Sequence, residues 1–287
     1  GSRRGPYPAR VLSARPAQPL NDPQAAGRAR VPLRAYLVAP VIAVVMLAVT
    51  LLSGARYGIG LRDPDGVIGA RLLLVLGGVA IFWALDIVPR ALRQARAEHL
   101  PMWATIRTVA RRRWPAKRLA IVLGSIVAFY LIYLCYRNIK SHVPLASPGL
   151  NDTSLLQLER DIFGRDPATL MHALFGTGIS AHVLSVVYLL FLTFVPLSVA
   201  LALVWSDDMA QGLWWLGTIS FNWVLGAASY FLIPSLGPIF VEPQLFAALP
   251  DTGVTALQNV LLEHRESFLA DPVGSGGLQS TAAFASL

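Results

Sequence analysis

Five long apolar segments dominate this chain and restrict the folds that it can adopt. They cover residues 33–52, 72–89, 119–136, 181–205 and 212–236. A helix rises about 1.5 Å per residue, so each segment is long enough to cross a hydrocarbon core about 30 Å thick. Of the 287 residues, 55% are hydrophobic and only 14% are charged. The pattern predicts an all-α polytopic membrane protein with five transmembrane helices and additional interfacial helices.

Basic residues are sorted between the gaps that separate these segments. At or before the start of the first segment lie Arg3, Arg4, Arg10, Arg15, Arg28, Arg30 and Arg34. Between the second and third segments lie Arg93, Arg96, Arg107, Arg111, Arg112, Arg113 and Lys117. Positively charged loops stay in the cytoplasm. We therefore expect a multi-pass protein of the cell (plasma) membrane with a cytoplasmic N-terminus. Its outer segments would be residues 53–71, 137–180 and 237 onward.

The formal net charge of +8 points to membrane lipid rather than to nucleic acid. The excess charge lies beside the apolar segments, where it meets anionic lipid headgroups. No basic and aromatic surface module typical of nucleic-acid binding is visible. Cys135 is the single cysteine and has no companion for a disulfide or a metal site. The histidines lack metal-ligand spacing, so neither a metal nor another cofactor is expected.

The chain divides into three predicted regions. These are a disordered cytoplasmic basic tail at 1–32, an accessory transmembrane pair with a basic cytoplasmic loop at 33–118, and a membrane core at 119–287. In the accessory pair, Asp86 lies near the cytoplasmic end of its segment. It is predicted to pair with Arg90, which is four residues further along the same helical face. Residues 100–117 are predicted to form an interfacial helix.

Short helices are predicted in the outer segments. Residues 151–162 begin with a capping sequence, Asn-Asp-Thr, and Gly164 supplies a stop. Asp166-Pro167 opens a second short helix, and Asp251-Thr252 caps a third that runs to about Leu269. The first two are too short to span a bilayer, so we expect them in the outer interface, and the third is expected to behave similarly.

Candidate site residues gather on the outer side. Arg137 and Lys140 are one helical turn apart and can converge on one anion, although both could instead reach lipid phosphates at the surface. From Tyr230 to Pro238, two prolines and a glycine break a helix at the membrane edge, which either lines a cavity or only ends the helix. Ser286 lies at a helix start that could bind phosphate, or could be an ordinary helix start. Each histidine is read as interfacial.

These features together resemble the type-2 phosphatidic acid phosphatase superfamily, and in particular its inositol phosphorylceramide synthase-like branch. The first family motif is a lysine, six residues, then Arg-Pro; here Tyr230, six residues, then Gly237-Pro238 occupies that frame. Residues 151–167 and the turn Ile-Pro-Ser-Leu-Gly-Pro also look like that branch. The middle of the second motif, Pro-Ser-Leu-His, is matched by Ala285-Ser286-Leu287. The resemblance covers roughly residues 119–287.

The resemblance implies a six-helix core with its active site at the outer face. Residues 119–287 would form the N-terminal part of that core. A histidine would attack a lipid phosphate to give a phosphohistidine, without a metal. No catalytic residue is assigned in the chain: the histidines are expected just after Leu287 and further downstream. Ser286 would bind phosphate, and we expect Arg137 and Lys140 to replace the cations missing at Tyr230 and Gly237.

Two classes of function remain open. The first is an integral membrane enzyme that removes or transfers a phosphoryl or phospho-head group on a membrane lipid at the extracytoplasmic face. The second is a catalytically silent membrane subunit or lipid-binding partner protein with the same fold, for which another membrane protein would be the partner. A histidine directly after Leu287 would favour the enzyme.

Overall fold

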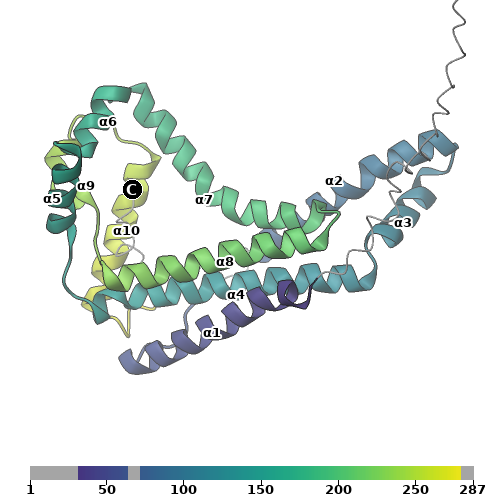
Figure 1. Ribbon diagram of the computed structural model, residues 1–287, viewed down its shortest axis with the longest axis horizontal. Helices are drawn as coiled ribbons and strands as arrows, with labels where there is room; N and C mark the ends of the chain where they lie inside the picture. The colour runs from purple at the N-terminus through teal and green to yellow at the C-terminus, as the bar shows by residue number, and fades with distance from the viewer. Residues whose placement is uncertain (1–31, 64–71, 279–287) are drawn as a thin grey trace, which may run out of the picture. The chain divides into compact units, whose positions relative to one another are not determined.

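The computed structural model describes residues 32–63 and 72–278, and Figure 1 shows how their helices are arranged. In these two ranges the chain forms helices and connecting loops, with no β-strand. Apart from Pro32, the predicted N-terminal tail lies outside the described residues. Ser286 also lies outside them.

The described residues form ten α-helices and one short 3-10 helix, joined by loops. In chain order they are α1 Leu33–Tyr57, α2 Leu72–Glu98, α3 Met102–Arg113, α4 Ala116–Ala146, α5 Asp152–Phe163, α6 Pro167–Phe175, α7 Ile179–Trp205, α8 Met209–Leu232, α9 Pro238–Val241, the 3-10 helix η3 Pro243–Phe246, and α10 Gly253–Ala270.

Three of these helices, α1, α4 and α7, are long and apolar enough to cross a membrane. Helices α2 and α8 contain 27 and 24 residues but are not among the three. Small and polar residues such as Gln211, Thr218 and Asn222 dilute the apolar character of α8. The predicted count of five transmembrane helices is therefore not confirmed, whereas an all-helical chain with membrane-length helices is.

Helices α1, α4 and α8 pack against one another and run in the same direction. Small side chains line the inner face of α1, where Ala35, Ala39 and Ala43 are almost completely buried at a spacing of four residues. Small residues at such a spacing let neighbouring helices approach closely. The C-terminal ends of the three helices meet, and we call this the C-terminal end of the bundle. Through α1 and α4, the predicted accessory region 33–118 packs directly against the predicted membrane core 119–287. The division of the chain into these two regions stays a prediction.

Helices α7 and α8 form an antiparallel pair joined by a short loop. Near the loop, Gly212 of α8 lies against the backbone of α7: a Cβ atom at this position would be 2.7 Å from the carbonyl oxygen of Ala202. Only a glycine permits this approach without movement of the chain. The close contact places the start of α8 directly against the end of α7.

The short helices follow the sequence prediction closely. α5 ends at Gly164, which adopts a φ of 71°, and α6 begins at Pro167. Thr252 caps α10 through a reciprocal pair of hydrogen bonds with Thr255. One detail of the prediction is wrong: the side chain of Asn151 makes no capping hydrogen bond at the start of α5. Instead it donates to the carbonyl oxygen of Pro234, as described below.

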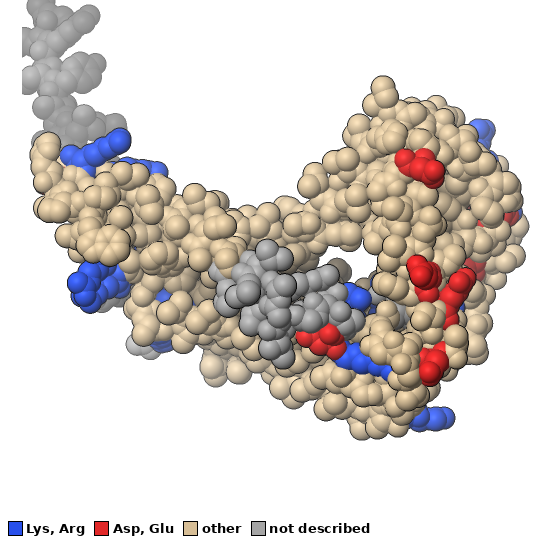
Figure 2. Space-filling view, turned by 180° about the vertical axis from the view of Figure 1, so that it is seen from behind, with Lys and Arg blue, Asp and Glu red and all other residues tan. Residues whose placement is uncertain are grey.

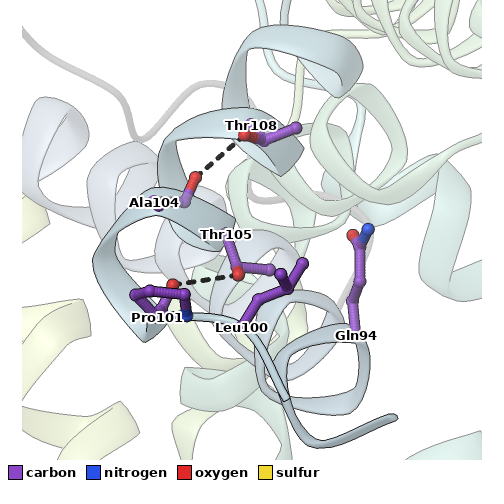
Figure 3. A pocket seen from close by; sticks show the side chains of 6 residues that line it. All are labelled: Gln94, Leu100, Pro101, Ala104, Thr105 and Thr108. Atoms are coloured by element: carbon purple, nitrogen blue, oxygen red, sulfur yellow. Dashed lines mark hydrogen bonds between the residues drawn. The ribbon is translucent and has the colours of Figure 1, made fainter. Parts of the chain in front are cut away.

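The connection between α2 and α3 encloses a small pocket of about 90 Å³ (Figure 3). The hydroxyls of Thr105 and Thr108 donate to the carbonyl oxygens of Pro101 and Ala104 inside α3, as the dashed lines show. The pocket lining contains no charged side chain. It therefore offers no counter-charge for a phosphate.

On the face drawn in Figure 2, long stretches of the protein surface carry no charged side chain.

Candidate functional site

Aromatic side chains hold α4 against α8 near the C-terminal end of the bundle. Trp223 of α8 stacks on Phe129 and on Tyr136 of α4, with ring centroids 4.9 and 5.7 Å apart. Tyr133 packs beside the same indole at 5.7 Å. The three α4 residues share one helical face because their spacing is four and then three residues. This face continues toward the end of the helix at Lys140.

Lys140 lies between two tyrosines at the end of this aromatic row. Its ammonium nitrogen is 5.7 Å from the ring centroid of Tyr136 and 5.4 Å from that of Tyr230, which is within the range of cation–π attraction. The two tyrosine hydroxyls are 3.1 Å apart and share a hydrogen bond. The lysine is only 8% exposed. The fold thus brings Lys140 and Tyr230, two of the predicted site residues, into contact.

Arg137 takes a different direction from the same helical turn. Its Nη1 donates to the hydroxyl of Tyr133 at 2.9 Å, one turn back along α4. The guanidinium carbon lies 5.9 Å from the centre of that tyrosine ring. Arg137 therefore contributes positive charge near the aromatic row, with its orientation fixed by Tyr133.

The turn after α8 is held by the start of α5. The carboxylate of Asp152 accepts hydrogen bonds from the backbone N–H of Leu236 at 2.9 and 3.1 Å and from that of Gly237 at 2.7 Å. Asn151 adds a backbone hydrogen bond of 2.9 Å to the carbonyl oxygen of Pro234. Gly237 has a φ of 105°, a conformation that side chains disfavour, and Pro238 then begins α9. These contacts fix the turn against α5.

A second set of contacts joins α5 to the helices on either side of it. Arg160 donates through Nε to Asp166 and through Nη2 to Glu242, both at 2.5 Å. These hydrogen bonds raise the pKa of Arg160, with Glu242 contributing more than Asp166. The guanidinium therefore ties the end of α5 to the residues that start α6 and follow α9.

Two polar groups near the turn have no hydrogen-bond partner among the described residues. The hydroxyl of Ser235 is completely buried, and so is the Nη1 nitrogen of Arg265 on α10. Burial lowers the pKa of Arg265, and the nearby Asp152 carboxylate offsets part of that decrease. Buried donors are normally satisfied, so orphaned donors at a turn are candidate ligand contacts.

A third group of contacts links α4 to the segment after α10. The side chain of Asn138, which is fully buried, accepts from the backbone N–H of Arg62 at 3.0 Å and donates to its carbonyl oxygen at 2.8 Å. The Arg62 guanidinium in turn donates to the carbonyl oxygens of Pro272, Val273 and Gly277 at 2.6 to 2.7 Å. Arg62 thus fastens residues 272–277 to α4 at Asn138, two residues before Lys140.

His142 lies at the contact between α1 and α4. Its Nδ1 lies 2.7 Å from the hydroxyl oxygen of Ser53, and its ring packs at 5.7 Å against Tyr57. The imidazole is 1% exposed. Within the described residues no group of three or more His, Cys, Asp or Glu side chains is placed to hold a metal ion.

The structure brings together part of the predicted site and adds residues that sequence reasoning missed. Lys140 and Tyr230 are in contact, and Arg137 lies on the adjacent face. Pro238 lies beyond the turn, at the start of α9.

Among the missed residues, Arg265 had a readable signal. It falls on the apolar face of α10, between Leu261 and Phe268, where a charge is unexpected. Arg62 had no such signal, because nothing in its neighbours distinguishes it from an ordinary loop arginine.

Comparison with known proteins identifies one relationship. No curated protein and no solved structure gives a significant match to the chain. Residues 153–287, which include the turn after α8 and all of α10, match the family model of the PAP2 superfamily.

Proposed function

We propose that this chain binds the phosphate of a membrane lipid at the C-terminal end of the bundle and takes part in its removal or transfer. The match to the PAP2 superfamily indicates lipid phosphatase-type chemistry. Residues 119–287 would then form the N-terminal part of a six-helix phosphatase-like core, with the site at the extracytoplasmic face. The inositol phosphorylceramide synthase-like branch is the relative that we favour within the superfamily.

The observation that carries the proposal is the position of Lys140. The first motif of the superfamily has its cations where this chain has Tyr230 and Gly237. The Lys140 ammonium lies 5.4 Å from the ring centre of Tyr230 and reaches that place from another helix. A buried ammonium attracts a phosphate far more strongly than an exposed one, because little water screens it. One of the two tyrosine hydroxyls beside it can donate to a phosphate oxygen, because the other donates within the pair.

Arg265 and Ser235 support the same assignment. Both offer a buried donor without a partner in the described part of the chain, and both adjoin the turn that Asp152 holds. Donors fixed before the substrate arrives stabilise the charge that develops on the equatorial oxygens during phosphoryl transfer. We assign these two residues, together with Lys140, to the phosphate.

In the proposed reaction a histidine nitrogen bonds to phosphorus while the bond to the lipid oxygen breaks. The leaving oxygen takes a proton from a second histidine. Water or another alcohol then accepts the phosphoryl group and frees the first histidine. No histidine among the described residues is assigned to either role, since His142 is enclosed between α1 and α4.

Binding of a short-chain phosphatidic acid to the detergent-solubilised protein tests the site directly. Lys140→Met removes the charge and keeps an unbranched side chain. We expect its Kd to rise by about tenfold or more, the loss associated with a charged hydrogen bond. Lys117→Met makes the same change at an exposed position near the other end of α4 and should leave the Kd unchanged. Equal affinities of the two variants would remove Lys140 from the site.

Turnover separates the two classes of function. An enzyme releases inorganic phosphate from phosphatidic acid, or transfers a head group to a second lipid, at a rate that Lys140→Met lowers and Lys117→Met does not. A catalytically silent subunit binds the lipid with the same dependence on Lys140 and shows no turnover. Diacylglycerol, which lacks the phosphate, serves as the control ligand and should not distinguish the two variants.

A further inference from the structure

A charged cluster lies where the second half of α2 meets the end of α3 and the end of α7. Its centre is the carboxylate of Asp86, which is 5% exposed. It accepts hydrogen bonds from Arg90 Nε at 3.1 Å, Arg113 Nε at 2.7 Å and Trp114 Nε1 at 3.2 Å. The pairing with Arg90 confirms the sequence prediction, and Arg113 supplies a second positive charge. The carboxylate is therefore fully engaged within the protein.

Arg113 connects this cluster to the loop after α7. It also donates to the carboxylate of Asp207, which Arg90 approaches to 3.9 Å. Burial lowers the pKa of Arg113, but its hydrogen bonds with Asp86 and Asp207 outweigh that effect and raise it overall. Both acidic groups are thus neutralised by arginines that face them.

Trp205, the last residue of α7, fixes α7 against α2. Its indole Nε1 donates to the carbonyl oxygen of Phe82 at 3.1 Å, and the two rings meet edge to face at 6.0 Å. Arg118 further donates to the carbonyl oxygens of Val204 and Ser206. The relative positions of α2 and α7 are consequently well defined here.

Between these two helices lies an open groove of about 320 Å³. It is lined by Leu85, Asp86, Pro89, Arg90, Arg93 and Trp205. Its volume is near the lower end of the roughly 300–1,000 Å³ typical of ligand sites. The groove is amphipathic: Leu85 and Trp205 expose 52% and 44% of their surfaces beside the two arginines.

The lining carries an excess of positive charge. Two arginines and one carboxylate face the groove, and that carboxylate is already paired with Arg113 outside it. Arg93 is exposed and makes no hydrogen bond or ion pair with any residue that the structure describes. Its guanidinium has the planar fork that matches two oxygens of a phosphate.

We propose that this groove binds the phosphate-bearing head group of an anionic membrane lipid, with Arg93 as its main contact. Leu85 and Trp205 would contact the lipid next to the head group. An anionic lipid fits better than a soluble phosphate because the groove presents exposed apolar surface directly beside its cations, and because one wall belongs to a membrane-length helix, α7. The site is separate from the proposed phosphate site and does not depend on it.

Retention of lipid by the full chain in nanodiscs tests this proposal. Discs are made of phosphatidylcholine alone or of an equal mixture with phosphatidylglycerol, and native mass spectrometry measures the phosphatidylglycerol that stays bound. Arg93→Gln is compared with Arg96→Gln, an exposed arginine of α2 that lies outside the groove. The two variants lose the same charge, so any difference between them reports the groove.

We expect Arg93→Gln to retain about tenfold less phosphatidylglycerol than Arg96→Gln, as for loss of a charged hydrogen bond. Equal losses in the two variants would mean general attraction of the basic surface and would overturn the proposal. A further arm adds inorganic phosphate to discs of phosphatidylcholine. Binding of phosphate there with the same dependence on Arg93 would also overturn it, in favour of a soluble ligand. Unfolding temperatures of both variants confirm that the protein remains folded.

Discussion

The carboxylate of Asp152 accepts a hydrogen bond of 2.7 Å from the backbone N–H of Gly237. The two residues are far apart in the chain, and Gly237 lies within the range that matches the PAP2 superfamily model. Through this contact the start of α5 holds the turn that leads from α8 into α9. This turn contains Ser235, one of the proposed phosphate contacts.

Replacement of Asp152 should therefore weaken both the fold and ligand binding. In Asp152→Ala the backbone N–H groups of Leu236 and Gly237 lose their buried acceptor, at a cost of about 1–3 kcal/mol each before relaxation. We expect a lower unfolding temperature in detergent and a raised Kd for short-chain phosphatidic acid. Asp161→Ala, on the same helix but exposed, should change neither. Wild-type stability of Asp152→Ala would contradict this contact.

Arg62 should control the order of the segment after α10. Arg62→Lys keeps the positive charge but cannot donate to three carbonyl oxygens in a fixed fork. We expect faster amide hydrogen exchange in peptides that cover residues 272–278, while exchange in α10 itself stays unchanged. Arg56→Lys is the matched control, because Arg56 is exposed on the last turn of α1. Identical exchange in the two variants would show that Arg62 does not hold the segment.

Tyr230→Phe separates the hydroxyl of Tyr230 from its ring. The phenyl ring retains its cation–π contact with Lys140, whereas the 3.1 Å hydrogen bond to Tyr136 is lost. If the hydroxyl also donates to the ligand, phosphatidic acid should bind several-fold more weakly, as expected for about 1 kcal/mol. Tyr36→Phe provides the control, because Tyr36 lies near the start of α1, at the other end of the bundle. An unchanged Kd for Tyr230→Phe would leave only the ring of Tyr230 in the site.

Local sequence signals predicted much of this fold. Gly164, Pro167 and Thr252 mark helix ends or starts in the structure because turn and capping chemistry acts within a few residues. The pairing of Asp86 with Arg90 could be predicted for the same reason. Such features depend on spacing alone, and spacing is visible in a sequence.

Contacts between distant segments were much harder to predict. The side chain of Asn138 hydrogen-bonds to the backbone of Arg62, and the Arg62 side chain donates to the carbonyl oxygen of Gly277. No local sequence pattern predicts either contact. Asn151 looked like a helix cap but binds the carbonyl oxygen of Pro234, because a tertiary partner replaced the local one. The nearness of Lys140 to Tyr230 followed only from the assumption that helix ends converge. In each case the missing information was the packing of α4 against its neighbours.

The close approach of α7 and α8 can be tested through two glycines of α8, Gly212 and Gly226. In Gly212→Ala the new Cβ would lie 2.7 Å from the carbonyl oxygen of Ala202 and 3.3 Å from the Cα of Leu203, so backbone must move. Overpacking of this kind costs about 1–3 kcal/mol. In Gly226→Ala the nearest atom is the Tyr230 hydroxyl at 3.7 Å, an ordinary contact, and alanine favours helix by up to about 1 kcal/mol. We therefore expect Gly212→Ala to lower the unfolding temperature and Gly226→Ala to preserve or raise it. Equal shifts of the two variants would show that α7 and α8 do not approach as closely at Gly212 as the structure has them.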